Sequence, residues 1–161
     1  MPVAVSDTGP LRYLVLIEAV DVLPRLFSRV LIPEVVAVEL SRPATPLPVR
    51  QWLATSPAWL ERHSVTPSAG EFPPRLGAGE RAAIGLAQAT RASVLLLDDR
   101  AAIAEARARG LEVTGTLGVL VRAAQLGLID LRSAFARLKA TNFRYRPQLL
   151  DALLARHEQE Q

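Results

Sequence analysis

Residues 93–100 read SVLLLDDR, and this stretch decides the fold class. A continuous apolar run between polar residues is typical of a strand that helices cover on both faces. Asp98 and Asp99 end the run, and the Ala-rich segment after them is expected to form a helix up to Arg109, stopped by Gly110. A strand buried on both faces and followed by a helix is the repeating unit of a parallel sheet.

The same alternation of strand and helix extends along the chain in both directions. We expect strands over residues 3–6, 29–32, 60–65, 93–97 and 112–114. We expect helices over residues 10–19, 21–27 (capped by Asp21), 33–40, 49–55, 80–87, 100–109, 117–126, 131–140 and 147–160, and a loop over residues 70–76. This order predicts an α/β protein with right-handed crossovers. Residues 1–128 are expected to form the domain, and the helices of residues 129–161 to pack on it.

The composition limits the available chemistry. The chain has 161 residues, 50% of them hydrophobic, and no cysteine, which excludes disulfides, thiolate nucleophiles and zinc held by cysteine. Its two histidines, His63 and His157, are far apart in sequence, so a histidine-rich metal site is not expected. Carboxylates, hydroxyls and arginines remain.

The basic residues are almost all arginine. Lys139 is the one lysine among 19 basic residues, and the formal net charge is +3. This bias fits either a GC-rich genome or an arginine-rich face that binds phosphate. The N-terminus lacks the pattern of a signal peptide, and no apolar run is long enough to span a membrane, so a cytoplasmic protein is expected.

Acidic residues recur at positions that a parallel sheet brings together. Asp7 directly follows the first expected strand, and Asp98 and Asp99 follow the strand over residues 93–97. Sites in open parallel sheets form outside the carboxyl ends of the strands. Glu39 and Glu80 lie on helices that begin at the same edge. We therefore expect four carboxylates to share one site.

Such a cluster needs a partner for its charge. Carboxylates a few ångströms apart raise one another's pKa or bind a cation. Oxygen ligands without histidine or cysteine suit Mg²⁺ or Mn²⁺, which can activate water and stabilise charge in phosphodiester cleavage. Each acid also has a structural interpretation: a helix cap for Asp7 and for one of Asp98 and Asp99, a solvated position for Glu39, and a helix N-terminus for Glu80.

Five segments together resemble the PIN-domain family: VSDTGPLRYL, LIPEVVAVEL, GAGERAAIGLA, SVLLLDDRAA and VTGTLGVL. The resemblance covers residues 3–126 and is greatest to a little-characterised bacterial and archaeal branch with a Gly-Glu helix. It implies a three-layer α/β/α sandwich with a parallel sheet of four to five strands and a C-terminal helical extension. It also implies a Mg²⁺- or Mn²⁺-dependent endoribonuclease, in many cases the VapC-type toxin of a toxin–antitoxin pair, with RNA as substrate, a cognate antitoxin and a homodimer.

The resemblance assigns roles to residues by position. Asp7, Glu39 and Glu80 match the first three catalytic acids, with Glu80 where aspartate is commoner. The fourth acid is Asp99 if the Asp-Arg pair is aligned, or Asp98 if strand length is used. The expected metal ligands are Asp7, Glu80, Asp98 and Asp99. Residues that could position water or RNA are Ser6, Thr8, Thr116, Arg12, Arg81 and Arg100.

Other functions fit less well. Residues 77–82, GAGERA, satisfy the letters of a dinucleotide-binding motif, but the preceding segment, residues 67–76, contains Pro73-Pro74 and cannot be the required strand. An aspartyl phosphotransferase usually carries a second aspartate at the position of Gly9, and a serine hydrolase would need a G-x-S-x-G motif. The main alternative is a catalytically silent PIN-like module that binds RNA or protein.

The apolar helices near the C-terminus leave a further choice open. Residues 117–126 and 149–154 are more apolar than a lone surface helix requires. They can form a dimer interface or cover the core.

Overall fold

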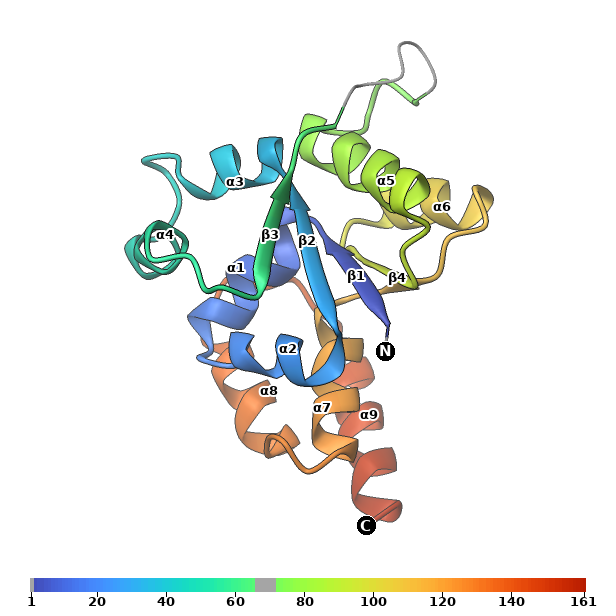
Figure 1. Cartoon of the computed structure of the whole chain (residues 1–161). Helices are drawn as coiled ribbons and strands as arrows, with labels where there is room; N and C mark the ends of the chain where they lie inside the picture. Colours follow the sequence, from blue (N-terminus) through green and yellow to red (C-terminus); the bar gives the residue numbers. More distant parts are fainter. Residues whose placement is uncertain (1, 66–71) are drawn as a thin grey trace.

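The computed structural model describes residues 2–65 and 72–161 (Figure 1). Its strands are β1 Val3–Ser6, β2 Arg29–Pro33, β3 Leu60–His63, β4 Val94–Leu96 and β5 Val113–Thr114. Its helices are α1 Thr8–Leu16, the 3₁₀ helix η1 Val20–Val22, α2 Leu23–Leu26, α3 Glu34–Leu40, α4 Leu47–Ala54, α5 Ala78–Thr90, α6 Arg100–Ala108, α7 Thr116–Gln125, α8 Leu131–Lys139 and α9 Pro147–Gln159. Two residues of the expected loop, 70 and 71, lie outside the described residues.

The strands form one parallel sheet in the order β3-β2-β1-β4-β5, which confirms the predicted α/β class. β1 pairs with β2 on one side and with β4 on the other. The direction in which successive strands are added therefore reverses at β1. The carboxyl ends of the strands flanking such a reversal form the usual ligand crevice of an open parallel sheet.

Apolar side chains on both faces of the sheet explain its three layers. Along β2, Val30 and Ile32 pack in one buried cluster, whereas Leu31 between them packs in the other. Leu96 and Leu95 divide in the same way in β4. The cluster around Leu31 and Leu95 includes α5 and α6, and the other includes α1, α7 and α8. Side chains that alternate between two apolar layers account for the continuous apolar run of the β4 segment.

The last three helices gather on one side of the molecule, with the C-terminus at the end of α9 (Figure 1). Phe135, Leu138 and Leu150 of α8 and α9 are buried in the same cluster as Val119 and Leu120 of α7. These apolar residues of α7, α8 and α9 thus cover the core of the chain itself.

The short helical segment after α1 begins earlier than expected. Asp21 was expected to cap a helix over residues 21–27, but it lies inside η1, whose cap residue Ala19 makes no side-chain capping bond. Glu18 has a φ of 60°, and the Ala19 amide donates to the Leu14 carbonyl at 2.8 Å. This tight turn brings Val20 into the core, so packing starts the helical turn before Asp21.

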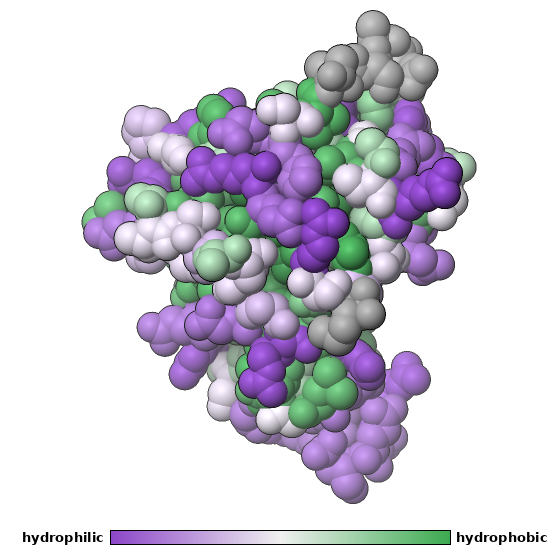
Figure 2. All heavy atoms as spheres, viewed as in Figure 1, coloured by the Kyte–Doolittle hydropathy of each residue, from purple (hydrophilic) through white to green (hydrophobic). Residues whose placement is uncertain are grey.

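Hydrophilic residues cover the distal part of α9 in the face shown in Figure 2, and the apolar residues visible elsewhere on it lie in scattered groups. None of the helices in the described parts of the chain is both long and apolar enough to cross a membrane.

Candidate active site

Two acidic segments meet where the sheet reverses. Asp7 follows β1, Asp98 and Asp99 follow β4, and the Asp7 amide donates to the Leu96 carbonyl at 3.1 Å. This bond continues the β1–β4 ladder by one residue. It places the aspartates of both segments at the carboxyl edge of the sheet, as expected from the sequence.

Asp7 is the most enclosed of these acids. Its residue is 9% exposed, and its side chain makes no capping bond to α1. Burial raises the pKa of Asp7 from 3.8 to about 7, with further increases from the charges of Glu80, Glu39 and Asp98 and a decrease from the Thr8 amide. Asp7 occupies the N-cap position of α1, but its side chain makes no capping bond there and lies near the carboxylates of Glu80, Glu39 and Asp98.

Glu39 is held against the start of α5. The Thr8 hydroxyl donates to Glu39 Oε2 at 2.6 Å. A Cβ atom placed on Gly79 would lie 2.8 Å from Glu39 Oε2 and 2.9 Å from Oε1. Because glycine occupies this position, the carboxylate from α3 can rest directly on the backbone of α5. Glu39 is thus a fixed member of the site rather than a solvated helix residue.

The two carboxylate oxygens of Glu80 have different roles: one stabilises the start of α5, and the other lies within the acidic cluster. Oε1 accepts from the Gly77 amide at 3.0 Å, which stabilises the first turn of α5. Oε2 is buried and has no hydrogen-bond partner among the described residues. Burial raises the pKa of Glu80, as do the nearby carboxylates of Asp99 and Glu39. Two facing carboxylates can form a hydrogen bond only when they share a proton, and a bound cation can take the place of that proton.

Asp98 is fixed by the start of α7. Its Oδ1 accepts from the Thr116 amide at 2.8 Å, and its Oδ2 accepts from the Thr116 hydroxyl at 2.6 Å. Burial raises the pKa of Asp98, and both bonds from Thr116 oppose that increase. Thr116 itself is fully buried. It acts on the site by holding this carboxylate.

Asp99 caps α6, since its Oδ2 accepts from the Ala102 amide at 3.0 Å. The capping role expected for one of the two aspartates thus falls to Asp99. Its charge also raises the pKa of Glu80, whereas the charge of Asp98 acts on Asp7. Asp98 and Asp99 therefore influence different acids of the same cluster.

The acids suit a hydrated cation better than a dry metal cage. In the described residues, no three histidine, aspartate or glutamate side chains are close enough to form a ready-made metal-binding group. Mg²⁺ keeps several waters and usually takes only one or two carboxylates directly. An all-oxygen donor set, the unpartnered Glu80 Oε2 and the raised pKa of Asp7 all fit such an ion.

Some of the residues that were expected to position water or RNA are buried or bonded to the backbone. Ser6 is fully buried, and its hydroxyl donates to the Asp7 carbonyl. Arg81 donates to the carbonyls of Leu76 and Pro74 and thereby holds the segment before α5.

Two other arginines lie differently. The Cζ atom of Arg12 lies over the Tyr13 ring, 5.7 Å from the ring centroid. The buried Nε of Arg12 has no hydrogen-bond partner within the described part of the chain. Arg100 is exposed and lines a cleft beside the aspartates.

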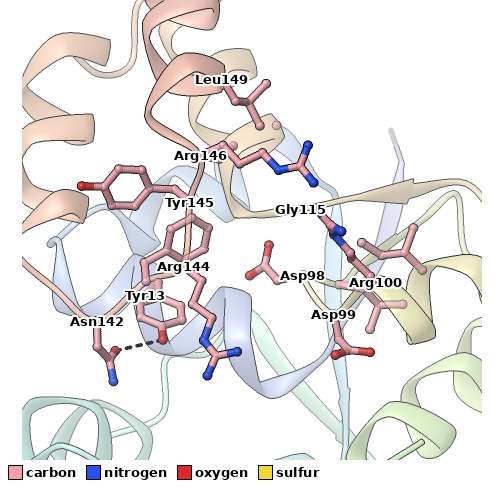
Figure 3. A pocket seen from close by; sticks show the side chains of 15 residues that line it. Tyr13, Asp98, Asp99, Arg100, Gly115, Asn142, Arg144, Tyr145, Arg146 and Leu149 are labelled. Atoms are coloured by element: carbon pink, nitrogen blue, oxygen red, sulfur yellow. Dashed lines mark hydrogen bonds between the residues drawn. The ribbon is translucent and has the colours of Figure 1, made fainter. Parts of the chain in front are cut away.

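That cleft, of about 1000 Å³, is lined in part by residues that the sequence analysis did not identify (Figure 3). Arg144 and Arg146, from the segment between α8 and α9, border it together with Asp98 and Asp99. The alternation Phe143-Arg144-Tyr145-Arg146 was the available signal, since basic and aromatic residues often combine in nucleic-acid binding. No local sequence pattern indicates that this segment lies near Asp98 and Asp99, which are more than 40 positions earlier in the sequence.

Gly79→Ala is expected to weaken Mn²⁺ binding about tenfold, as losses of outer-shell contacts to a metal site do. The new methyl group would displace the Glu39 carboxylate, which the Thr8 hydroxyl holds in place. Because the displaced atoms end a flexible side chain, the free energy of unfolding should change by less than about 1 kcal/mol. Titration calorimetry and urea unfolding measure the two effects.

Gly85→Ala, in the same helix, is the matched control. Its Cβ would meet Val65 Cγ1 at 3.5 Å, an ordinary contact. It should leave Mn²⁺ binding unchanged. Equal Mn²⁺ affinities in the two variants would contradict the role given to the Glu39–Gly79 contact.

Thr116→Val is expected to destabilise the protein by about 1–3 kcal/mol, because it leaves a buried carboxylate oxygen without its donor. The pKa of Asp98 should rise further, since the lost bond favours the charged form. Urea unfolding and carbon NMR of the Asp98 carboxyl group test both effects. Thr116→Ser should restore both values. A pKa of Asp98 that is the same in all three proteins would contradict this assignment.

A family model described as DUF3368: PIN domain matches residues 3–159. The matched region includes every strand of the sheet and extends through α8 and α9. No curated protein matches the chain.

Proposed function

Because the chain belongs to the PIN-domain family, we propose that it is a Mg²⁺- or Mn²⁺-dependent endoribonuclease that hydrolyses RNA phosphodiester bonds. PIN domains are generally nucleases. The observation that carries the proposal is the environment of Asp7: burial raises the pKa of its carboxyl group, and the charges of Glu80, Glu39 and Asp98 raise it further. A cluster that is costly when empty favours binding of a divalent cation.

In this proposal Asp7, Glu80, Asp98 and Asp99 hold the ion directly or through water, and Glu39 completes the acidic site. When bound, the ion supplies a Lewis acid that polarises the phosphate and stabilises the charge that develops during cleavage. The other residues orient the acids. Thr116 fixes both oxygens of Asp98, and Thr8 fixes one oxygen of Glu39, so neither carboxylate has to reorganise when substrate binds.

A catalytically silent binding module is the second candidate. Two observations favour it: Glu80 Oε1 is used as a helix cap, and no three acids within the described ranges form a direct metal-binding group. Such a module would bind RNA or protein without cutting RNA. The two candidates differ in whether phosphodiester bonds are broken.

The test is RNA cleavage by the purified chain. A 5′-labelled RNA is incubated with Mg²⁺, Mn²⁺ or EDTA, and the products are separated on a denaturing gel. Internal cleavage in Mg²⁺ or Mn²⁺ that stops in EDTA supports the nuclease. Binding of RNA without cleavage under all three conditions supports the silent module and contradicts the nuclease.

We propose further that the protein is a toxin of the VapC type, restrained in the cytoplasm by a small cognate antitoxin, and that it forms a homodimer. Family membership and the need to restrain a cutting site support this role. Growth arrest on induced expression, reversed by the short neighbouring gene, is the expected outcome. Light scattering of the purified chain tests the dimer, and a monomer mass would contradict it.

A further inference from the structure

The cleft beside the aspartates has a basic rim made by two distant parts of the chain. Arg100 begins α6, and Arg144 and Arg146 come from the segment between α8 and α9. In Figure 3 the side chains of Arg100 and Arg146 point toward the space around Asp98, whereas that of Arg144 extends past Tyr13; all of these residues line the same cleft. The basic rim, defined as Arg100, Arg144 and Arg146, is therefore adjacent to the acidic site.

The segment that carries two of these arginines alternates between the core and solvent. Phe143 and Tyr145 are half-buried and pack against the main apolar cluster, whereas Arg144 and Arg146 are exposed. In an extended chain, successive side chains point in opposite directions. Burial of the two aromatic rings thus holds both guanidinium groups on the outer side.

Tyr13 of α1 anchors the same segment. Its hydroxyl donates to Asn142 Oδ1 at 2.9 Å, and its ring meets Phe143 edge to face, with centroids 5.0 Å apart. α1 begins immediately after Asp7. The element that follows the most buried acid therefore also positions the arginine segment.

The rim arginines are not used to neutralise the protein's own acids. Arg29 and Arg109 form ion pairs with Glu61 and Glu105. By contrast, no side-chain hydrogen bond or ion pair of Arg100, Arg144 or Arg146 is present in the described structure. Their guanidinium groups are available to an external anion, which they can bind in a bidentate manner.

We propose that Arg144 and Arg146, together with Arg100, bind the phosphate backbone of single-stranded RNA and lead it to the acidic site. This proposal rests on the proposed function for its substrate. Tyr13, Phe143 and Tyr145 are only half-buried and contribute to the lining of the same cleft. Unpaired bases stack on aromatic rings, so arginines combined with rings fit single-stranded RNA better than an acidic peptide.

The test compares Arg144→Gln/Arg146→Gln with Arg107→Gln/Arg122→Gln. Both double variants lower the net charge by two, but Arg107 and Arg122 are exposed residues of α6 and α7 outside the cleft lining. Binding of a fluorescein-labelled single-stranded oligouridylate is measured by anisotropy in EDTA over a range of salt concentrations. No cleavage takes part in this measurement.

The rim variant should bind about tenfold more weakly, and its plot of log affinity against log salt should flatten by about 1.4, the change expected for two phosphate contacts to a single strand. The control variant should keep the slope of the unmodified protein. Equal affinities and slopes for the two variants would overturn the proposal. So would a rim variant that binds RNA normally but loses binding to polyglutamate, because the rim would then recognise protein carboxylates.

These results are independent of the nuclease activity. A rim-dependent loss of RNA binding in a protein that never cleaves RNA would contradict the proposed function and leave the basic rim in place. Metal-dependent RNA cleavage with the same KM in the rim variant and the control variant would support the proposed function and contradict the role of the basic rim.

Discussion

Asp7→Asn is expected to abolish metal-dependent RNA cleavage, with a loss on the order of a thousandfold. The substitution keeps the shape of the side chain but removes the charge at the centre of the acidic cluster. A divalent ion contributes several kcal/mol to the stabilisation of transition-state charge, and each 1.36 kcal/mol corresponds to about tenfold in rate. Initial cleavage rates with saturating Mn²⁺ measure the loss.

Asp151→Asn is the matched control, because Asp151 is an exposed residue of α9. It changes the net charge equally and should cleave RNA at the unmodified rate. RNA cleavage that is unchanged in Asp7→Asn would refute the enzyme as described here.

The same Asp7→Asn variant is expected to be more stable than the unmodified protein when no metal is present. Burial raises the pKa of Asp7 from 3.8 in the unfolded chain to about 7 in the fold. Between these values the unfolded state binds fewer protons, so stability falls as the pH rises from about 4 to about 7. The accumulated cost amounts to at most about 4 kcal/mol above pH 7. Asparagine removes this cost.

Urea unfolding in EDTA at several pH values tests this expectation. The stability advantage of Asp7→Asn should be largest near pH 8 and disappear well below pH 3.8, where Asp7 is protonated in both the folded and the unfolded state. Asp151→Asn should show no such trend. An Asp7→Asn protein that is equally or less stable near pH 8 would mean that the Asp7 carboxylate is not strained by its surroundings.

Local pattern was sufficient to predict the layers of this fold. The apolar run before Asp98 has the length and flanks of a strand covered on both faces, and β4 is an interior strand of the sheet, between β1 and β5. The hydrophobic pattern of single segments could not predict the strand order, because strand pairing depends on contacts between segments that are distant in sequence. It predicted that the ends of β1 and β4 share an edge, and the order β2-β1-β4 places those two ends next to each other.

The site was predictable as a set of acids but not in its contacts. Glu80 was expected to act either as a helix-end residue or as a site residue, and its two oxygens divide between these roles. The Thr8–Glu39 bond joins positions 31 residues apart, and the Tyr13–Asn142 bond joins positions 129 apart. Such pairs have no local pattern. For the same reason the arginines that follow Asn142 were not identified from the sequence.

The central claim is that acids from separate segments together bind one divalent cation. Titration of the unmodified protein with Mn²⁺, followed by electron paramagnetic resonance of the free ion, tests it most directly. The account predicts saturable binding that is lost in Asp7→Asn and kept in Asp151→Asn. Mn²⁺ binding that is absent, or equal in all three proteins, would contradict it.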